Sequence, residues 1–325
     1  MQAPEFWRRD GLLAHGLQPL AWIYGAAGRL RWAVTRPWRG DVPVICIGNL
    51  VAGGAGKTPT ALAVARALTQ RGVTVHFLSR GHGGRLPGPI RVDPARHLAR
   101  DVGDEPLLLA AAAPAWIARD RAAGARAAIA AGAQAIVMDD GFQNPTIQKD
   151  FSIIVINAAQ EFGNKRVMPS GPLRESVNGG LSRTNLIVVV GEVSNELKKT
   201  IPENIPIIEA KFEIKKENKN FKGQNITAFA GIAYPEKFFL SLEEQGGKIV
   251  RQITYPDHYI YTENDLLTLA ETANKTKSIL VSTQKDNVRI PKAYRSLVNT
   301  LEGEIDFENE DLLIEILTNV IENYF

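Results

Sequence analysis

A glycine-rich stretch, Gly48-Asn-Leu-Val-Ala-Gly-Gly-Ala-Gly-Lys-Thr58, separates a predicted strand from a predicted helix. The apolar run at residues 42–47 predicts a buried strand, and residues 60–70 carry apolar side chains at helical spacing. Another apolar run, at 73–78, predicts a second strand. A strand, a helix and a strand within so few residues form a βαβ unit, so we expect a parallel sheet.

The turn itself has the composition of a phosphate-binding loop. Glycine allows positive φ angles and close approach, so backbone N–H groups at a helix N-terminus can surround a phosphate group. Lys57 would neutralise the β- and γ-phosphates, and the Thr58 hydroxyl would ligate Mg²⁺. The strict pattern GxxxxGK[ST] is not met, because Val51 takes its first place, but G-G-x-G-K-T is. We therefore expect a nucleotide to bind at Gly53, Gly54, Ala55, Gly56, Lys57 and Thr58.

One subclass of such nucleotide-binding proteins is disfavoured by a single position. The partitioning-type ATPases carry a second lysine before the glycines, and this chain has Ala52 there.

The acidic partner of this turn should stand at the end of an apolar strand, where it can hold Mg²⁺ directly or through water. The stretch Ala135-Ile-Val-Met-Asp-Asp140 supplies two candidates, Asp139 and Asp140. Most adjacent aspartates cap a helix or stand in a solvated turn, but this pair ends a predicted buried strand. We expect one or both to complete the metal site, and the sequence leaves open which one ligates the ion directly.

Strand and helix patterns alternate through the rest of the chain. Strands are predicted at residues 135–138, 151–156, 186–190, 207–212, 226–230, 248–253 and 279–281, and helices at about 105–113, 119–131, 235–245, 263–272 and 311–322. The alternation predicts an α/β protein with a P-loop NTPase-like parallel sheet and flanking helices. A charged, breaker-rich stretch at 215–223 divides a larger P-loop core at 41–214 from a smaller α/β C-terminal domain at 215–325.

Composition excludes several classes of protein. The 325 residues are 45% hydrophobic and 22% charged, which is typical of a globular protein and not of disordered, collagenous or polytopic membrane chains. With one cysteine, Cys46, the chain has neither a disulfide framework nor a CxxC metal site, which indicates a reducing compartment.

The formal net charge of +3 is unevenly distributed. Residues 1–148 contain 17 Lys and Arg against 10 Asp and Glu, and residues 149–325 contain 21 against 25. The basic residue also changes at this point, from 16 Arg with one Lys to 6 Arg with 15 Lys. Two domains of different character, or two coding sources joined in one chain, would both produce this shift.

Part of the basic surplus lies in residues 1–40, which hold six Arg and four of the five Trp. The apolar run at 17–28 contains a Gln-Pro pair and is far shorter than the roughly 20 residues of a spanning helix. No secretory signal is evident either. Arg heads with Trp and Leu between them favour an amphipathic helix on an anionic membrane surface, and a helical extension packed on the core is the alternative.

Several further motifs follow one another along the chain. They are Gly48-Asn-Leu with Gly-Gly-Ala-Gly-Lys-Thr-Pro59, Ser79-Arg-Gly81, Val102-Gly-Asp-Glu-Pro106, Asp139-Asp-Gly-Phe-Gln143, Pro169-Ser-Gly-Pro-Leu-Arg-Glu175, Asp257-His258 and Thr283-Gln-Lys-Asp286. In this set and order, residues 40–290 resemble the tetraacyldisaccharide 4'-kinases, a family that phosphorylates the lipid A precursor.

The resemblance implies a peripheral kinase on the cytoplasmic face of the bacterial inner membrane. It would use ATP and Mg²⁺ and transfer the γ-phosphoryl group to the 4'-hydroxyl of a tetraacylated glucosamine disaccharide 1-phosphate. An anionic membrane surface is the other expected partner, and neither a nucleic acid nor an obligate protein partner is expected.

The resemblance also assigns roles to residues by motif position. Asp104 would be the base for the sugar hydroxyl, with His258 as its orienter or proton acceptor. Arg174 would face phosphate and Glu175 would lie near the metal. A helix N-cap for residues 105–113 is the alternative role of Asp104, and both roles could hold at once. In isolation, His258 would be a surface residue. Without the neighbouring motifs, a surface ion pair of little energetic value is preferred for Arg174 and Glu175.

Three further positions are candidates on weaker grounds. Arg121 is a phosphate-facing candidate by resemblance, with Arg119 and Arg126 as competitors. Lys285 and Asp286 follow the predicted strand at 279–281, and ligands of α/β proteins bind at the carboxyl ends of strands.

The chain departs from the family pattern at two places. His82 stands where the family often has tyrosine, which puts a stacking or hydroxyl role there in doubt. Asn144 stands where histidine is commonest, and asparagine can donate a hydrogen bond but cannot titrate.

A second class of function is compatible with the glycine-rich turn alone, a P-loop ATPase or GTPase that switches or loads a partner. Such a protein needs no sugar-binding groove and no Trp/Arg segment. A guanine-specificity motif N-K-x-D would favour it, and Thr283-Gln-Lys-Asp286 does not match that motif. The kinase hypothesis is therefore favoured.

Overall fold

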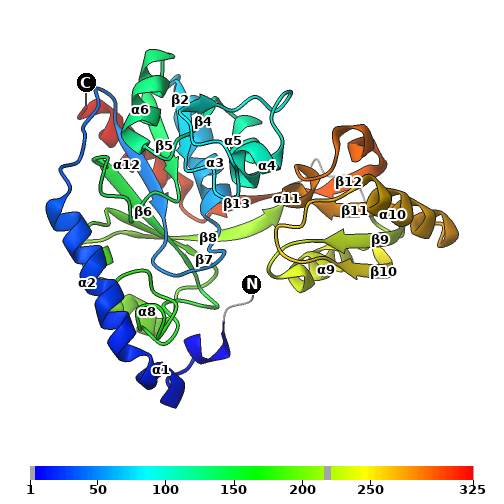
Figure 1. The fold of residues 1–325 in the computed structure, drawn as a ribbon, viewed down its shortest axis with the longest axis horizontal. Helices are drawn as coiled ribbons and strands as arrows, with labels where there is room; N and C mark the ends of the chain where they lie inside the picture. Colours follow the sequence, from blue (N-terminus) through cyan, green and yellow to red (C-terminus); the bar gives the residue numbers. More distant parts are fainter. Residues whose placement is uncertain (1–3, 216–220, 325) are drawn as a thin grey trace.

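The computed structural model describes residues 4–215 and 221–324, which form two lobes of unequal size (Figure 1). The larger lobe is built on a nine-stranded sheet in the order β13-β8-β7-β6-β1-β5-β2-β4-β3. All neighbouring strands run parallel except β3, which is antiparallel to β4, and β13, which is antiparallel to β8. The strands are β1 (Val44–Gly48), β2 (Val75–Ser79), β3 (Ile90–Arg91), β4 (Ala115–Ile117), β5 (Ala135–Asp139), β6 (Phe151–Asn157), β7 (Leu186–Val190), β8 (Ile207–Ile214) and β13 (Gly303–Phe307).

The central strands are mostly apolar on both faces, and both faces are buried, as is typical of a parallel sheet covered by helices. In β1, Ile45 and Ile47 pack with α3 in one hydrophobic cluster, while Val44 and Cys46 pack with α6 in another. The helices of this lobe are α3 (Lys57–Thr69), α4 (Ala99–Val102), α5 (Asp104–Ala110), α6 (Arg121–Ala130), α7 (Val177–Leu181), α8 (Asn195–Thr200) and α12 (Glu310–Glu322). The expected P-loop-like parallel sheet with flanking helices is confirmed.

The smaller lobe has its own four-stranded parallel sheet, in the order β10-β9-β11-β12. Its strands are β9 (Asn225–Ala230), β10 (Lys248–Thr254), β11 (Ile279–Thr283) and β12 (Val298–Leu301). Its helices are α9 (Pro235–Glu244), α10 (Glu263–Lys275), the short α11 (Gln284–Asn287) and the 3-10 turn η2 (Lys292–Leu297).

The end of the chain does not belong to the smaller lobe, so the expected C-terminal domain at 215–325 is too long. Strand β13 pairs with β8 of the large sheet, and α12 packs against α3. The sequence predicts the helix at 311–322, but its apolar face does not indicate which lobe it packs against. The short strands β12 and β13 were not predicted. The second sheet therefore ends before Gly303.

The N-terminal segment forms η1 (Glu5–Trp7), α1 (Leu12–Gly16) and α2 (Gln18–Val34) along the outside of the larger lobe (Figure 1). Only Ala14 and Ala21 of the two α-helices are buried. Among the described residues, no helix combines the length and the apolar character needed to cross a bilayer.

Candidate active site

The glycine-rich turn connects β1 to the N-terminus of α3. Gly53 and Gly56 have φ angles of 128° and 89°, values that side-chain-bearing residues rarely adopt. A Cβ atom at Gly54 would meet no atom within 4 Å, so this side of the turn is open. No side chain caps α3, whose first residue is Lys57. Backbone N–H groups at an uncapped helix N-terminus are suited to a phosphate group.

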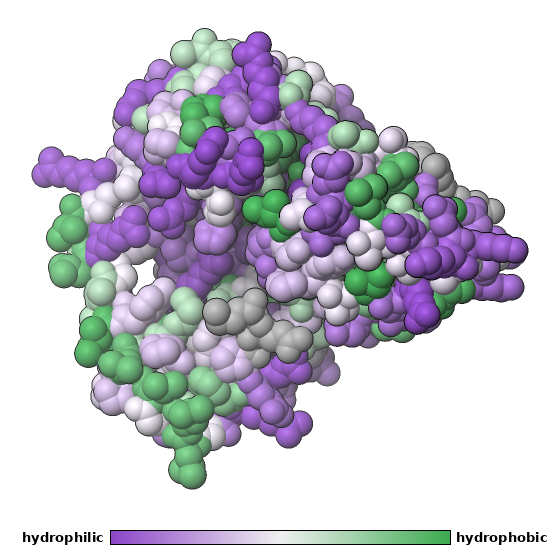
Figure 2. All heavy atoms as spheres, turned by 45° about the vertical axis from the view of Figure 1, so that its right-hand side comes forward, coloured by the Kyte–Doolittle hydropathy of each residue, from purple (hydrophilic) through white to green (hydrophobic). Residues whose placement is uncertain are grey.

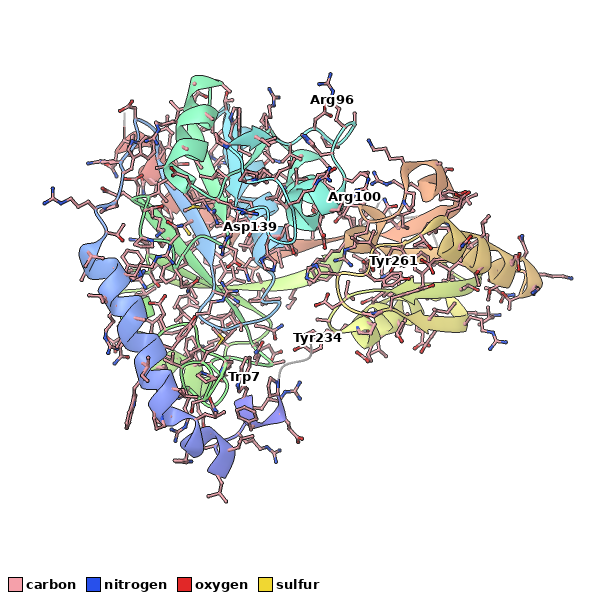
Figure 3. The ribbon with its side chains drawn as sticks, in the orientation of Figure 1. Trp7, Arg96, Arg100, Asp139, Tyr234 and Tyr261 are labelled. Carbon is pink, nitrogen blue, oxygen red and sulfur yellow. The ribbon has the colours of Figure 1, made fainter. Side chains whose placement is uncertain are left out.

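The two aspartates lie beside this turn because β5 pairs directly with β1. Thr58 Oγ1 donates a hydrogen bond to Asp139 Oδ2 at 2.9 Å, and Lys57 Nζ lies 3.7 Å from Asp140 Oδ1. Asp139 is 3% exposed and stands at the centre of the larger lobe in Figure 3, so it is not in a solvated turn. Asp140 has a φ angle of 53° and donates its backbone N–H to Ile47 O.

The environment of Asp139 fits a cation. Burial, together with the charge of Asp140, raises the pKa of the Asp139 carboxyl to about 7. Its Oδ1 atom is buried and accepts no hydrogen bond from any described residue. A hydroxyl and two carboxylates are oxygen donors of the kind that Mg²⁺ prefers. Thr58, Asp139 and Asp140 would therefore hold such an ion.

Arg174 and Glu175 are brought to the site by backbone pairing with the glycine-rich turn. Leu50 O accepts a hydrogen bond from Arg174 N, and Pro172 O accepts one from Ala52 N, both at 2.8 Å. Arg174 Nη1 donates to Asp140 Oδ1 at 2.9 Å. The two residues do not form the surface ion pair considered above, because their partners lie in the site.

Glu175 takes its hydrogen bonds from the other side of the site. Its Oε1 accepts from Gln143 Nε2 at 3.1 Å, and its Oε2 is paired with Arg183 Nη2. Gln143 also donates to Asn49 O at 3.0 Å, so it bridges the turn and the carboxylate. Gln143, Asn49 and Arg183 were not among the expected site residues. Gln143 lies within the Asp139-Asp-Gly-Phe-Gln motif, which is the signal that could have identified it.

Of the three arginine candidates near α6, only Arg121 is directed inward. It is 3% exposed, and its pKa is lowered to about 10 by burial and by the nearby charge of Arg80, while Asp140 opposes this. Its buried Nε makes no hydrogen bond to a described residue. Arg126 instead lies over the Trp38 ring, and Arg119 contacts Arg85 O at 3.5 Å.

Asp104 approaches the same edge of the sheet from α5. A Cβ at Gly81, just after β2, would lie 3.1 Å from Val102 O, so the Val102-Gly103 segment covers the carboxyl end of β2. Strand β2 pairs with β5, whose end carries Asp139. The cap of α5 is Gly103 and no side chain caps the helix, so Asp104 is not the N-cap that the sequence alone suggested.

His258 comes from the smaller lobe and meets Asp104 across the two lobes. Its Nδ1 lies 2.8 Å from Asp104 Oδ2, and its backbone φ angle is 62°. The His258 N–H donates to Gly231 O, which follows β9. The carboxyl edges of the two parallel sheets therefore meet at this pair, as expected for a site built from both lobes.

Arg289 is a site residue that sequence reasoning missed. Its side chain is fully buried, and its Nε donates to Asp104 Oδ2 at 2.7 Å while Nη1 donates to Gly231 O at 2.7 Å and to Asp286 Oδ1 at 3.2 Å. Asp286 Oδ1 also accepts from Gly231 N and Tyr261 OH, each at 2.9 Å. Tyr261 lies on the smaller lobe in Figure 3.

This network fixes the ionisation state of Asp104. Burial alone raises the pKa of the Asp104 carboxyl, but the hydrogen bond from His258 and the charge and hydrogen bonds of Arg289 outweigh burial and lower the pKa to about 2. Asp104 is therefore a carboxylate over the whole neutral range.

Lys285 and Asp286 have different positions in the structure. Lys285 Nζ lies 3.0 Å from Glu105 Oε1 and so bridges the lobes beside Asp104. Asp286 is fully buried and accepts hydrogen bonds from Arg289 Nη1 and Gly231 N, so it holds these groups in place.

Asn144 has a local structural role. Its Oδ1 accepts from Thr146 N at 2.8 Å and from Thr146 Oγ1 at 2.7 Å, an arrangement that closes a turn.

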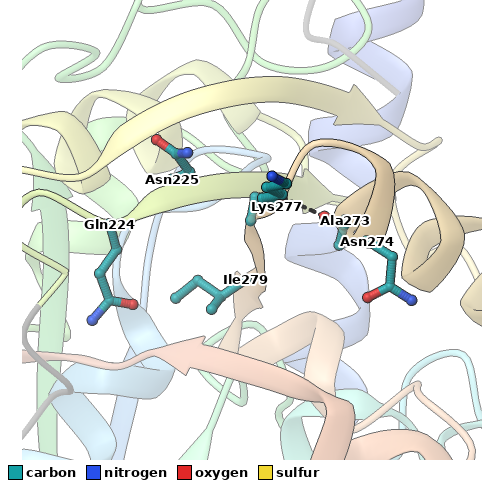
Figure 4. A pocket seen from close by; sticks show the side chains of 7 residues that line it. Gln224, Asn225, Ala273, Asn274, Lys277 and Ile279 are labelled. Carbon is teal, nitrogen blue, oxygen red and sulfur yellow. Dashed lines mark hydrogen bonds between the residues drawn. The ribbon is translucent and has the colours of Figure 1, made fainter.

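A pocket elsewhere on the smaller lobe is separate from this site (Figure 4). Its lining includes Asn225 and Ile279, the first residues of β9 and β11. It therefore lies at the amino ends of strands whose carboxyl ends carry Gly231 and Thr283.

A glycine-rich turn, an adjacent acid pair on the neighbouring strand and an acid–histidine pair from two lobes define a P-loop phosphotransferase. Comparison with known proteins gives the same class. The chain matches the family of tetraacyldisaccharide-1-P 4'-kinases over residues 13–322 and belongs to that family.

Its relatives include two proteins named tetraacyldisaccharide 4'-kinase. The protein from Rhodospirillum centenum is 48% identical, over 99% of this chain and 97% of its own length, and the one from Rhodospirillum rubrum is 46% identical, over 98% and 97%. Among solved structures, the "apo" form of LpxK from Aquifex aeolicus in complex with ATP has a TM-score of 0.79 at 23% identity, over 95% of this chain and all of that one. That likeness supports the fold.

Proposed function

We propose that this chain transfers the γ-phosphoryl group of ATP to the 4'-hydroxyl of tetraacyldisaccharide 1-phosphate and so makes lipid IVA in lipid A biosynthesis. Two relatives named tetraacyldisaccharide 4'-kinase are 46% and 48% identical to this chain over almost its whole length. The observation that carries the proposal is the Asp104–His258 pair, which joins the lobes at the carboxyl edge that also holds the glycine-rich turn. A switch ATPase or GTPase needs no such pair, because its acceptor is water.

The chemistry follows from the positions of the charged groups. The bond between the γ-phosphorus and the bridging oxygen breaks while a bond to the sugar 4'-oxygen forms. Asp104 orients the hydroxyl, and the Asp104–His258 pair takes its proton. Lys57, Arg174 and Arg121 supply positive charge around the transferred group and the departing ADP. Mg²⁺ held by Thr58, Asp139 and Asp140 would neutralise phosphate charge, and the motif position of Glu175 makes this carboxylate a further candidate ligand.

A transfer assay tests this proposal. Purified protein is incubated with ATP labelled at the γ-phosphate and with tetraacyldisaccharide 1-phosphate in detergent micelles, and Lys57→Ala serves as the background. Labelled lipid that depends on Lys57 supports the kinase. Release of free phosphate without labelled lipid would contradict it and favour the ATPase alternative.

The exposed side of α1 and α2 supports attachment to a membrane surface. Leu12, Trp22, Ile23 and Val34 are 93%, 66%, 67% and 71% exposed. Figure 2 shows hydrophobic residues gathered along this edge of the molecule. Arginines on the same segment would meet anionic head groups. We infer that the protein is peripheral on the cytoplasmic face of the inner membrane, where its lipid substrate would lie.

Replacing Leu12, Trp22 and Ile23 together by Glu is expected to reduce binding to anionic vesicles by at least tenfold, because three exposed apolar anchors become charged. Co-sedimentation with phosphatidylglycerol vesicles measures the effect. Leu240→Glu on α9 is the matched control, since Leu240 is 57% exposed on the other lobe. Equal binding by the triple variant and wild type would assign the anchoring to another surface.

A further inference from the structure

The C-terminal end of α2 contacts the site through one tryptophan. The Arg183 guanidinium lies 4.1 Å from the centre of the Trp32 ring and 4.6 Å from the Phe142 ring. Lys149 Nζ also lies over Trp32, at 4.7 Å. Arg183 is thus held between an aromatic ring of α2 and one that belongs to the Asp139-Asp-Gly-Phe-Gln motif.

The same guanidinium is the partner of Glu175. Arg183 Nη2 is paired with Glu175 Oε2, and Nε donates to Gly179 O at 3.2 Å. Its Nη1 is buried and makes no hydrogen bond to any described residue. Aromatic contacts therefore fix the position of a group whose remaining polar contacts go to Glu175 and to the helix beside it.

Contacts with the N-terminal segment, from η1 to the first residue of α2, hold the other end of the stretch that carries Glu175. Arg166 Nε donates to Asp10 Oδ1 at 2.8 Å, and Arg166 Nη1 contacts Gln18 of α2. Ser170 Oγ donates to Ala14 O at 2.6 Å. Trp7, labelled in Figure 3, donates its Nε1 hydrogen to Pro169 O at 3.1 Å. The chain from 166 to 175 is therefore attached to the N-terminal helices before it reaches the site.

We propose that Arg183 is a positioning residue for Glu175, and that Trp32 holds Arg183 in place, so that the seating of α2 sets the geometry of the metal-site carboxylate. The inference rests on the proposed function only in taking Glu175 as part of the Mg²⁺ site. The paired contacts of one guanidinium with Trp32 and with Glu175 carry it.

Substitutions can distinguish the charge of Arg183, the planar shape of its guanidinium and the aromatic ring of Trp32. Arg183→Gln removes the charge and the pairing with Glu175, so we expect the Mg²⁺ concentration for half-maximal ATP binding to rise by about 10- to 100-fold. Arg183→Lys keeps the charge but loses the planar fork, so a smaller rise is expected. Trp32→Ala should give a shift in the same direction, and Trp32→Phe should restore most of the wild-type behaviour.

Calorimetric titration of each variant with ATP at graded Mg²⁺ measures this shift without requiring turnover. The double variant Arg183→Gln/Trp32→Ala should be no worse than Arg183→Gln alone if both act through one contact. Arg126→Lys is the matched control, because Arg126 also lies over a tryptophan, Trp38, at 5.3 Å. Its Mg²⁺ requirement should be unchanged.

Two results would overturn the inference. One is an unchanged Mg²⁺ requirement in Arg183→Gln, and the other is strict additivity of the two substitutions. If Arg183→Gln unfolds, Arg183→Lys and Trp32→Phe are compared instead. The inference expects the Mg²⁺ requirement to rise in Arg183→Lys and to stay near the wild-type value in Trp32→Phe. Failure of the proposed kinase function would appear separately, as wild-type protein that binds Mg²⁺ and ATP but forms no labelled lipid.

Discussion

Asp104→Asn is expected to lower kcat for lipid phosphorylation by about 10²- to 10⁴-fold, while the affinity for ATP stays nearly unchanged. The amide has the size of the carboxylate but lacks its charge, so it can no longer stabilise the proton that the Asp104–His258 pair takes up, and this proton moves only in the transition state. Asp104 is held by His258 and Arg289, which are its hydrogen-bond partners. Initial rates with labelled ATP, together with calorimetric ATP binding, separate the two quantities.

His258→Ala is the companion variant for this prediction. Because the two side chains act as one unit, the double variant should be hardly slower than Asp104→Asn alone. Equal losses in kcat and in ATP affinity would instead indicate that Asp104 acts on the nucleotide or on folding. Multiplying losses in the double variant would show that the histidine has an independent role.

The sequence predicted best those parts of the protein that are local in the chain. The strand, turn and helix around Lys57 follow from periodicity and glycine content, and Asp139 follows from its place at the end of an apolar strand. The structure brings these residues together because β1 and β5 are neighbours in a parallel sheet. The sequence does not state that β1 and β5 are neighbours, but most other strand orders would leave Asp139 and Asp140 without a role.

Parts of the site that depend on long-range packing could not be predicted from the sequence. Arg289 is 185 residues from Asp104, and its only local signal is its place three residues after Asp286. The role of Arg183 could not be predicted because it depends on where α2 places Trp32. The return of β13 to the large sheet was missed because a five-residue strand is equally compatible with either lobe.

The change in composition near residue 148 does not coincide with a boundary in the fold. Strand β6, which follows the change, pairs with β1, which precedes it. Asp104 precedes it, and His258 and Arg289 follow it. The sheet and the site are therefore both assembled from the two halves, so the change does not mark a structural boundary.

Arg289→Met is expected to destabilise the protein by about 3–5 kcal/mol at neutral pH. The Arg289 side chain has no exposed surface and pairs with two buried carboxylates, Asp104 and Asp286. A buried charge left without its partner is costly, whereas methionine fills a similar volume. Urea unfolding at pH 7 measures the loss. Arg295→Met is the matched control, because Arg295 donates to the carbonyl oxygens of Ile290 and Val288 and forms no ion pair with a described residue. It should cost about 1–2 kcal/mol.

Acid should reduce the deficit of Arg289→Met, and the sign follows from Asp104. In the wild type the pKa of this carboxyl is lowered from 3.8 to about 2, so its contribution to stability is present above pH 4 and is lost as the pH falls toward 2. The variant lacks much of that contribution, so the two unfolding free energies should converge over this range. The Arg295→Met deficit should not change with pH there. A deficit of Arg289→Met that stays constant from pH 7 to pH 2 would show that packing, and not the pairing with Asp104, is what Arg289 contributes.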